Sequence, residues 1–192
     1  MNIFVLDLDP LVCAHYHCDK HVTKMVVEYT QLLATCHWHF YKRGEHDSGW
    51  WLQMPKPMNE NHPCALWVRR SAENYNWLHE LLTELLQEFR RRFGHSHSYE
   101  RQCVMLIDPP DGLVSSTQGV GRTNFIQSVP EQFWHADPTI AYRSYYVVMK
   151  SSFATWRHPR SAPMWYQHAE VELLRQDCGG GQNLLEPPVE AG

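Results

Sequence analysis

The sequence predicts a mainly α-helical protein that folds as one compact helical bundle. Apolar residues recur at three- and four-residue spacing over two long stretches, 19–41 and 61–94. Asp-Pro pairs, which cap and open helices, occur at residues 9–10 and 137–138. A chain of 192 residues is long enough for a single domain with its own hydrophobic core.

The chain opens with an apolar, partly β-branched run that starts at Ile3 and closes on Asp7 and Asp9. Its length suits either one short buried strand or an extended segment. Asp9 then suits the N-cap of a first helix, and Pro10 its first turn. The predicted fold is therefore a helical bundle with at most one N-terminal strand.

Two long helices are expected to form most of the core. The first runs from Asp19 to about Tyr41. The second begins near Asn61, a residue that can cap a helix, and keeps its helical period until Gly94. A shorter helix is expected over 99–106.

Loops and a tail divide the remaining chain. Residues 42–60 combine glycine, proline and tryptophan, so we expect a lid or binding loop there. A last helix is expected from Pro138 to about Trp156. Residues 1–168 are then one catalytic or binding domain, and 169–192 form an acidic tail with too little apolar area to pack, which we expect to be disordered.

Composition narrows the class of protein. The formal net charge of -4 argues against a broad non-specific polyanion binder, but segment 120–169 carries five basic residues against two acidic ones, so a local basic face is expected. The six cysteines form no CxxC pair, which is typical of reduced thiols in a cytosol. No apolar run approaches the roughly 20 residues that span a bilayer, and no secretion signal is apparent. We expect a cytoplasmic protein with no membrane partner and leave its oligomeric state open.

The densest group of reactive side chains lies at the start of the first long helix. His17, His21, Lys24 and Glu28 fall on one line of a helix that turns about 100° per residue, and Lys20 stands beside them. Residues on both flanks of this stripe are apolar or small, so little of the helix is suited to open solvent. The pattern predicts that the stripe lines an active cleft.

One chemistry for the stripe uses a lysine amine. Lys20 or Lys24 would have its charged form disfavoured by neighbouring cations such as protonated His21, which frees the amine to attack an electrophilic carbon. Glu28 could shuttle the proton or stabilise a developing cation, with Asp19 as a second acid. No cofactor is needed for this chemistry.

A second chemistry uses a metal ion. His17 and His21 stand one helical turn apart, which suits two ligands for zinc or iron, and a carboxylate or a further histidine would complete the shell. The alternative to both chemistries is a plain solvated helix face.

Two further places could bind substrate. Asn61 and His62 begin a helix and could donate to a ligand, although Asn-x-Pro is also ordinary capping chemistry. Arg143, Lys150 and Trp156 lie in a stretch that interleaves basic and aromatic residues, a combination that serves phosphate contact and base stacking. The alternative for the aromatic residues is core packing.

The stretches DKHVTKMVVEYTQLL (19–33) and NHPCALW (61–67) resemble phage and bacterial proteins of the pyrimidine-dimer DNA glycosylase-like family, of endonuclease V type. The resemblance covers residues 1–100. The later motifs AYR (141–143) and FATW (153–156) are similar to a phage subgroup of the same family.

This resemblance implies a compact helical domain that acts on DNA in the host cytoplasm. Lys20 and Lys24 take the place of the basic pair that holds DNA phosphates, and Glu28 or Asp19 is the nearest acid. In the family an N-terminal amine attacks the sugar C1′ to form a Schiff base. Here residue 2 is Asn, where the family enzyme has a processed Thr terminus.

Three functional hypotheses follow. The leading one is a DNA-acting enzyme that cleaves a glycosidic bond or modifies a base, as a glycosylase or lyase does. The second is an iron- or zinc-dependent hydrolase or oxygenase acting on a nucleotide or nucleic acid. The third is a non-catalytic phage protein that binds a nucleotide or inhibits a host factor.

Overall fold

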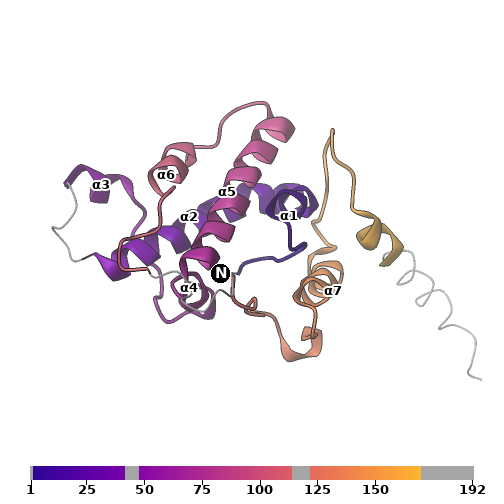
Figure 1. The fold of residues 1–192 in the computed structure, drawn as a ribbon. Coiled ribbons are helices and arrows are strands. Elements are labelled where there is room, and N and C mark those ends of the chain that lie inside the picture. The colour runs from indigo at the N-terminus through magenta and orange to yellow at the C-terminus, as the bar shows by residue number, and fades with distance from the viewer. Residues whose placement is uncertain (1, 42–47, 114–121, 170–192) are drawn as a thin grey trace, which may run out of the picture.

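The computed structural model describes residues 2–41, 48–113 and 122–169, and within these ranges it contains helices and loops but no strand (Figure 1). The mainly α-helical fold predicted from the sequence is confirmed. None of the described helices is both long enough and apolar enough to cross a membrane. The elements in chain order are α1 (Pro10–Tyr16), α2 (Asp19–Phe40), α3 (Ser48–Gln53), α4 (Pro63–Val68), α5 (Ala72–Phe93), α6 (Glu100–Met105), the 3-10 helix η1 (Glu131–Phe133) and α7 (Pro138–Lys150).

The core forms where α2 and α5 pack against each other, with α1 packed on α5 and α4 packed on both. The apolar faces of both long helices are buried, as their three- and four-residue spacing predicts. Each end of α5 has its own cap: Ser71 accepts a hydrogen bond from the backbone N–H of Asn74 at 3.2 Å, and Gly94 ends the helix with a φ of 77°. That φ lies in the left-handed region, which favours glycine.

The single helix expected over 61–94 is wrong, because the chain forms α4 and α5 with a break between Val68 and Ala72. Ser71 provides the reason. A serine hydroxyl competes with the helical backbone for hydrogen bonds, and at an N-cap it satisfies a donor that the new helix leaves open. The apolar period continues through the break because both helices face the same core.

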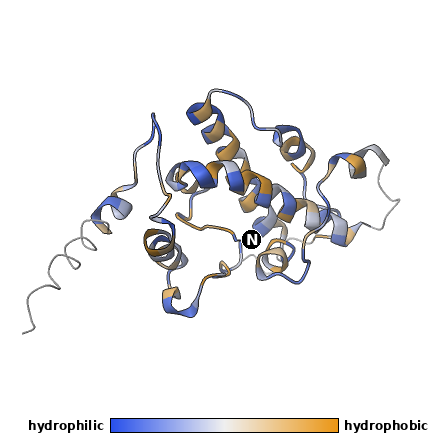
Figure 2. Cartoon of the chain, turned by 180° about the vertical axis from the view of Figure 1, so that it is seen from behind, coloured by the Kyte–Doolittle hydropathy of each residue, from blue (hydrophilic) through white to orange (hydrophobic). Residues whose placement is uncertain are grey.

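The N-terminal run is buried but extended, so the second of its two predicted forms is correct. Figure 2 shows this hydrophobic segment running through the molecule, and Ile3 to Leu6 are at most 5% exposed. Side chains take the place of a neighbouring strand in satisfying its backbone. The N–H of Phe4 donates to the Tyr29 hydroxyl at 3.1 Å, and Arg143 Nε donates to the Leu6 carbonyl at 2.8 Å.

The last predicted helix ends at Lys150 and not near Trp156. After α7 the chain turns and runs back past α1 and the start of α2 (Figure 1). The Thr155 carbonyl accepts from the Asp19 N–H at 2.8 Å, and Trp156 Nε1 donates to the Tyr16 carbonyl at 3.1 Å. These contacts hold the segment extended, and a short helical stretch follows over 164–169.

The predicted lid or binding loop is described only in part. Residues 42–47 and the tail after 169 lie outside the described residues, and α3 follows the first of these gaps. Beyond α3 the loop is fastened to α2: Trp38 Nε1 donates to the Pro55 carbonyl at 3.0 Å, and the Met58 N–H donates to Thr35 Oγ1 at 2.9 Å. This part of the loop therefore lies against the core.

Candidate active site on helix α2

The predicted stripe on α2 and the turn before it does not lie on one surface. His17 is 0% exposed and His21 4%, so both belong to the interior. Lys20 and Lys24 are exposed, and Glu28 lies between these extremes with its side chain 14% exposed. The candidate site is therefore built from the lysines and the glutamate, with the two histidines beneath it.

His17 is held from both sides. Its Nδ1 lies 2.8 Å from the Cys13 carbonyl, which only accepts, so Nδ1 carries the proton. Its Nε2 then accepts from the Tyr29 hydroxyl at 3.2 Å. Burial lowers the pKa of His17 to about 4, which keeps the ring neutral. Both ring nitrogens are occupied by these bonds.

His21 is packed among aromatic rings. Its ring stacks on Phe4 at a centroid distance of 4.5 Å and meets Tyr146 at 5.0 Å and Phe153 at 5.5 Å. Burial, followed by the charge of His17 and of nearby lysines, lowers the pKa of His21 to about 2. Its buried Nδ1 has no hydrogen-bond partner among the described residues.

Because both pKa values are depressed, stability should depend on pH. Below about pH 6.5 the unfolded chain protonates these histidines while the folded protein does not, so the free energy of unfolding should fall as the pH drops from 7 towards 4. Each histidine contributes up to about 1.4 kcal/mol per pH unit to the slope of the unfolding free energy against pH.

Urea unfolding of His21→Leu across this range should show a shallower slope than the wild type. The matched change His168→Leu, at an exposed histidine near the end of the described chain, tests whether removing any histidine has this effect; equal slopes in wild type and His21→Leu would contradict the buried, neutral state of His21.

The metal hypothesis finds no ligand set in the described part of the chain. No group of three histidine, cysteine, aspartate or glutamate side chains there could hold a metal ion. To bind a metal, His17 would have to give up one of its hydrogen bonds: the bond to the Cys13 carbonyl if Nδ1 were the ligand, or the bond to the Tyr29 hydroxyl if Nε2 were the ligand. The zinc or iron site at His17 and His21 stays a prediction from sequence spacing.

The lysines form a surface together with aromatic rings. The Nζ of Lys20 lies 4.5 Å above the centre of the Phe153 ring, and that of Lys150 lies 4.8 Å from the centre of the Tyr145 ring. The charges of Lys150, Lys24 and Lys20 all lower the pKa of His21, so the three ammonium groups lie within electrostatic range of that ring. We call Lys20, Lys24, Lys150, Tyr145 and Phe153 the basic–aromatic surface.

Glu28 lies at one edge of this surface. Its Oε1 is 3.1 Å from Lys24 Nζ, and its Oε2 accepts from the backbone N–H of Asn2 at 3.3 Å. Lys24 is 62% exposed at its side chain while Glu28 is 14% exposed. The arrangement places a largely buried carboxylate within proton-transfer distance of an amine that a ligand can reach.

Asn61 and His62 have local roles at the start of α4, and the binding role predicted for them stays a prediction. The backbone N–H of Asn61 donates to Asn59 Oδ1 at 3.0 Å, and its side chain is exposed. His62 caps α4 by accepting the Cys64 N–H at Nδ1, 3.2 Å away. Burial lowers the pKa of His62, and the carboxylate of Glu28 partly offsets this effect.

Asp19 anchors the C-terminal segment. Its carboxylate accepts from the backbone N–H of Arg157 at 3.2 Å, from Thr155 Oγ1 at 3.3 Å and from Arg92 Nη1 at 3.3 Å. These bonds occupy both of its oxygens. The predicted role of Asp19 as a second catalytic acid has no support in this geometry.

Arg143 and Trp156 also hold the fold together. Arg143 donates to the Leu6 carbonyl and pairs with Asp7 at 3.0 Å, so its guanidinium fixes the N-terminal segment. Trp156 donates to the Tyr16 carbonyl. Of the residues predicted to bind substrate in this part of the chain, only Lys150 lies on the basic–aromatic surface.

Sequence reasoning missed Asn2 and a buried charge cluster around Glu88. Asn2 links Glu28 to the loop after residue 125, because its Nδ2 donates to the Ser128 carbonyl at 2.8 Å. Glu88 is 0% exposed at its side chain and pairs with Arg92 and Arg160. Arg92 stands at i,i+4 from Glu88 and is a local partner, but Arg160 and the partners of Asn2 are distant in the chain and follow no local pattern.

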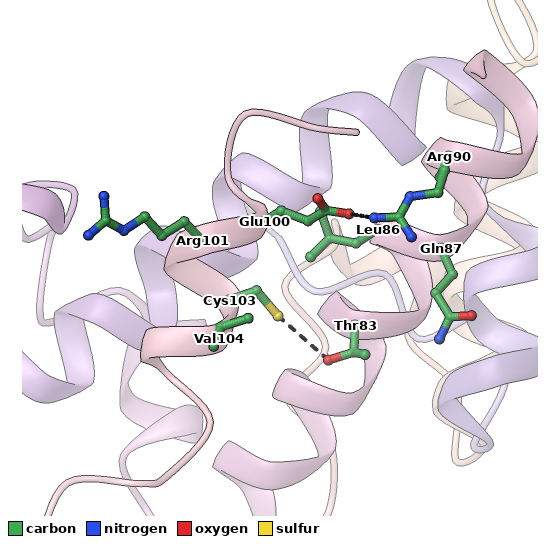
Figure 3. Close-up of a pocket in the computed structure, with 8 residues that line it drawn as sticks. All are labelled: Thr83, Leu86, Gln87, Arg90, Glu100, Arg101, Cys103 and Val104. Atoms are coloured by element: carbon green, nitrogen blue, oxygen red, sulfur yellow. Dashed lines mark hydrogen bonds and ion pairs between the residues drawn. The ribbon is translucent and has the colours of Figure 1, made fainter. Parts of the chain in front are cut away.

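A separate pocket of about 470 Å³ lies between α5 and α6 (Figure 3). Figure 3 shows Arg90 and Glu100 paired across it, Arg101 pointing away from that pair, and Cys103 facing Thr83. Burial raises the pKa of the Cys103 thiol, which disfavours the nucleophilic thiolate.

Comparisons of the chain with family models, with curated proteins and with solved structures found no match. The resemblance to the pyrimidine-dimer DNA glycosylase-like family therefore stays a prediction.

Proposed function

We propose that this chain is an enzyme that acts on DNA in the cytoplasm and cleaves a glycosidic bond or modifies a base, with Lys24 and Glu28 at its reaction centre. The observation that supports the proposal most is the pairing of an exposed lysine with a largely buried glutamate, 3.1 Å apart, at the edge of a surface with three lysines. Nucleic-acid phosphates are held by such lysines.

The pair can serve as nucleophile and base. Glu28 would take the proton of the Lys24 ammonium, and the freed amine would attack the sugar C1′. The bond from C1′ to the base breaks, and the base leaves with the electron pair and takes the proton that Glu28 had accepted. Glu28 then removes a proton from the substituted amine and delivers it to the ring oxygen as the C1′–O bond breaks, which leaves an imine between Lys24 and C1′.

Borohydride trapping tests this proposal. The protein is incubated with damaged and with undamaged duplex DNA, and borohydride reduces any imine to a stable covalent adduct. We expect an adduct on damaged DNA with the wild type, no adduct with Lys24→Ala, and a loss of about 100-fold or more in the rate of adduct formation with Glu28→Gln. Both variants should keep the wild-type circular dichroism, because neither side chain is part of the core.

A matched control is Lys56→Ala, which removes an exposed lysine from the loop after α3. It should form the adduct as the wild type does. An adduct of undiminished yield with Lys24→Ala would contradict the assignment of the nucleophile. Stoichiometric iron or zinc in the purified protein, together with no adduct, would instead favour the metal-dependent alternative.

A further inference from the structure

A second pocket, of about 460 Å³, lies in the loop before α7. Its most prominent side chain is Trp134, which is 57% exposed although tryptophan is usually well buried. The pocket is lined by Phe125, Ile126, Gln127, Trp134, His135 and Ala136. None of these residues was singled out from the sequence as a binding residue.

The indole of Trp134 is held in place. Its Nε1 donates to the Val129 carbonyl at 2.9 Å, which fixes the ring. Gln127 holds His135, the residue after Trp134, by two hydrogen bonds. Its Nε2 donates to the His135 carbonyl at 2.6 Å, and its Oε1 accepts from the His135 N–H at 3.1 Å. An exposed ring fixed in this way loses little conformational entropy when a flat ligand stacks on it.

A polar group that could bind a nucleotide lies in the lining of the pocket, and a cation lies close to it. His135 Nδ1 accepts the Asp137 N–H at 2.9 Å, so in the neutral ring Nε2 carries the proton and can donate. The guanidinium of Arg122 lies 3.6 Å from the centre of the Phe125 ring, which is another lining residue. The lining thus combines an aromatic platform with a hydrogen-bond donor, and the cation of Arg122, which is not itself a lining residue, contacts one of the lining rings.

Asn2 connects this pocket to the reaction centre. Its backbone N–H donates to Glu28, and its side chain donates to the carbonyl of Ser128, the residue after Gln127. On the other side, Phe133 packs against Tyr145 of the basic–aromatic surface at a centroid distance of 5.2 Å. A nucleic acid held by that surface would have the Trp134 pocket beside it.

We infer that the Trp134 pocket receives an unpaired base of a single-stranded or locally opened nucleic acid, which stacks on the indole. The inference rests on the proposed function and adds its substrate class: DNA whose base is out of the duplex. Every base has a flat π-face, so the exposed indole would bind it with little sequence preference. Enzymes that act on a base must take it out of the stack, which requires a place to hold unpaired nucleotides.

The experiment is fluorescence anisotropy with a short labelled oligodeoxythymidine and with a duplex of equal length. Trp134→Ala should raise the Kd for the single strand about tenfold, and Trp134→Phe about threefold or less, because a phenyl ring still stacks. The dependence of Kd on salt should stay as in the wild type for both variants, because neither removes a charge. Lys24→Ala, by contrast, should make that dependence shallower.

The matched control is Val104→Ala. This residue is 70% exposed and lines the similarly sized pocket between α5 and α6 (Figure 3), so its loss tests whether trimming any exposed apolar side chain weakens binding. It should leave Kd unchanged. Circular dichroism of each variant verifies that the fold is retained.

The outcomes separate the two proposals. A Kd for Trp134→Ala within twofold of the wild type, together with weaker binding by Lys24→Ala, would overturn the base-stacking role and leave the proposed function standing. If the wild type binds neither the single strand nor the duplex, the proposed function fails, and the inference that rests on it fails too. Equal weakening by Trp134→Ala and Val104→Ala would also overturn the assignment.

Discussion

Replacing Glu88 by alanine is expected to lower the free energy of unfolding by about 3–5 kcal/mol. Glu88 is 0% exposed at its side chain and lies 2.7 Å from Arg160 and 3.0 Å from both Arg91 and Arg92. Arg92 is itself 0% exposed at its side chain. Removing the carboxylate leaves a buried guanidinium with one fewer counter-charge, and such a loss costs far more than the loss of a surface ion pair.

Urea unfolding of Glu88→Ala beside Glu80→Ala measures this effect. Glu80 is exposed on the same helix, so its removal should change the unfolding free energy by no more than about 0.5 kcal/mol. A Glu88→Ala protein as stable as Glu80→Ala would show that the arginines find other partners. The charge cluster would then have no part in joining the C-terminal segment to α5.

The same cluster gives stability a second dependence on pH, in a more acidic range than that of the histidines. Burial by itself raises the pKa of Glu88, but hydrogen bonds from Arg160 and Arg91 and the charge of Arg92 outweigh it and lower the pKa to about 2. A carboxylate with a depressed folded pKa stabilises the protein above its unfolded value near 4.5, and this contribution is lost as the pH falls from there towards 2. Glu88→Gln should lack this part of the acid transition.

The second large effect is expected from Asn74→Ala, which should lower the free energy of unfolding by roughly 2–4 kcal/mol. Asn74 is 0% exposed, and its amide donates to the Trp67 carbonyl at 2.7 Å and to Thr123 Oγ1 at 2.8 Å. Its Oδ1 also accepts the Thr123 N–H at 2.9 Å. Alanine would leave the buried groups on both sides without partners, and each such group is costly.

Asn76→Ala, two residues further along α5 and exposed, is the matched control and should have little effect. Thermal or urea unfolding of the two variants compares them directly. Because Thr123 begins the segment that leads to Phe125, Asn74→Ala should also weaken single-strand binding at the Trp134 pocket. Unchanged stability in Asn74→Ala would mean that water or a shifted backbone satisfies the freed groups.

Most helices could be predicted from the sequence because their determinants are local. The apolar period and Asp19 mark α2, and Asp9 caps α1 by accepting from two backbone N–H groups of its first turn. The break before α5 and the early end of α7 were missed. The first depends on a local cap that the continuous apolar period hides, because Ser71 accepts from the Asn74 N–H. The second depends on a distant bond, because the Thr155 carbonyl is held by the Asp19 N–H of α2.

The site was predictable only in part, for a similar reason. The line through His21, Lys24 and Glu28 on α2 is a property of any helix, but which of them reach solvent depends on what packs over the helix. Phe4 and Phe153 cover His21, and they come from opposite ends of the chain. The pocket at Trp134 depends on a glutamine clamp that has no sequence signature.

The extended N-terminal segment also has a consequence for how the protein is made. Ile3 to Leu6 are synthesised well before their partner, because the side chain that bonds the Leu6 carbonyl belongs to Arg143, 137 positions later. At about 5–20 residues per second, several seconds pass before that partner exists. During this time a short apolar stretch stays uncovered on the nascent chain, and this makes it a natural binding segment for chaperones and the place where aggregation would begin if synthesis stalled.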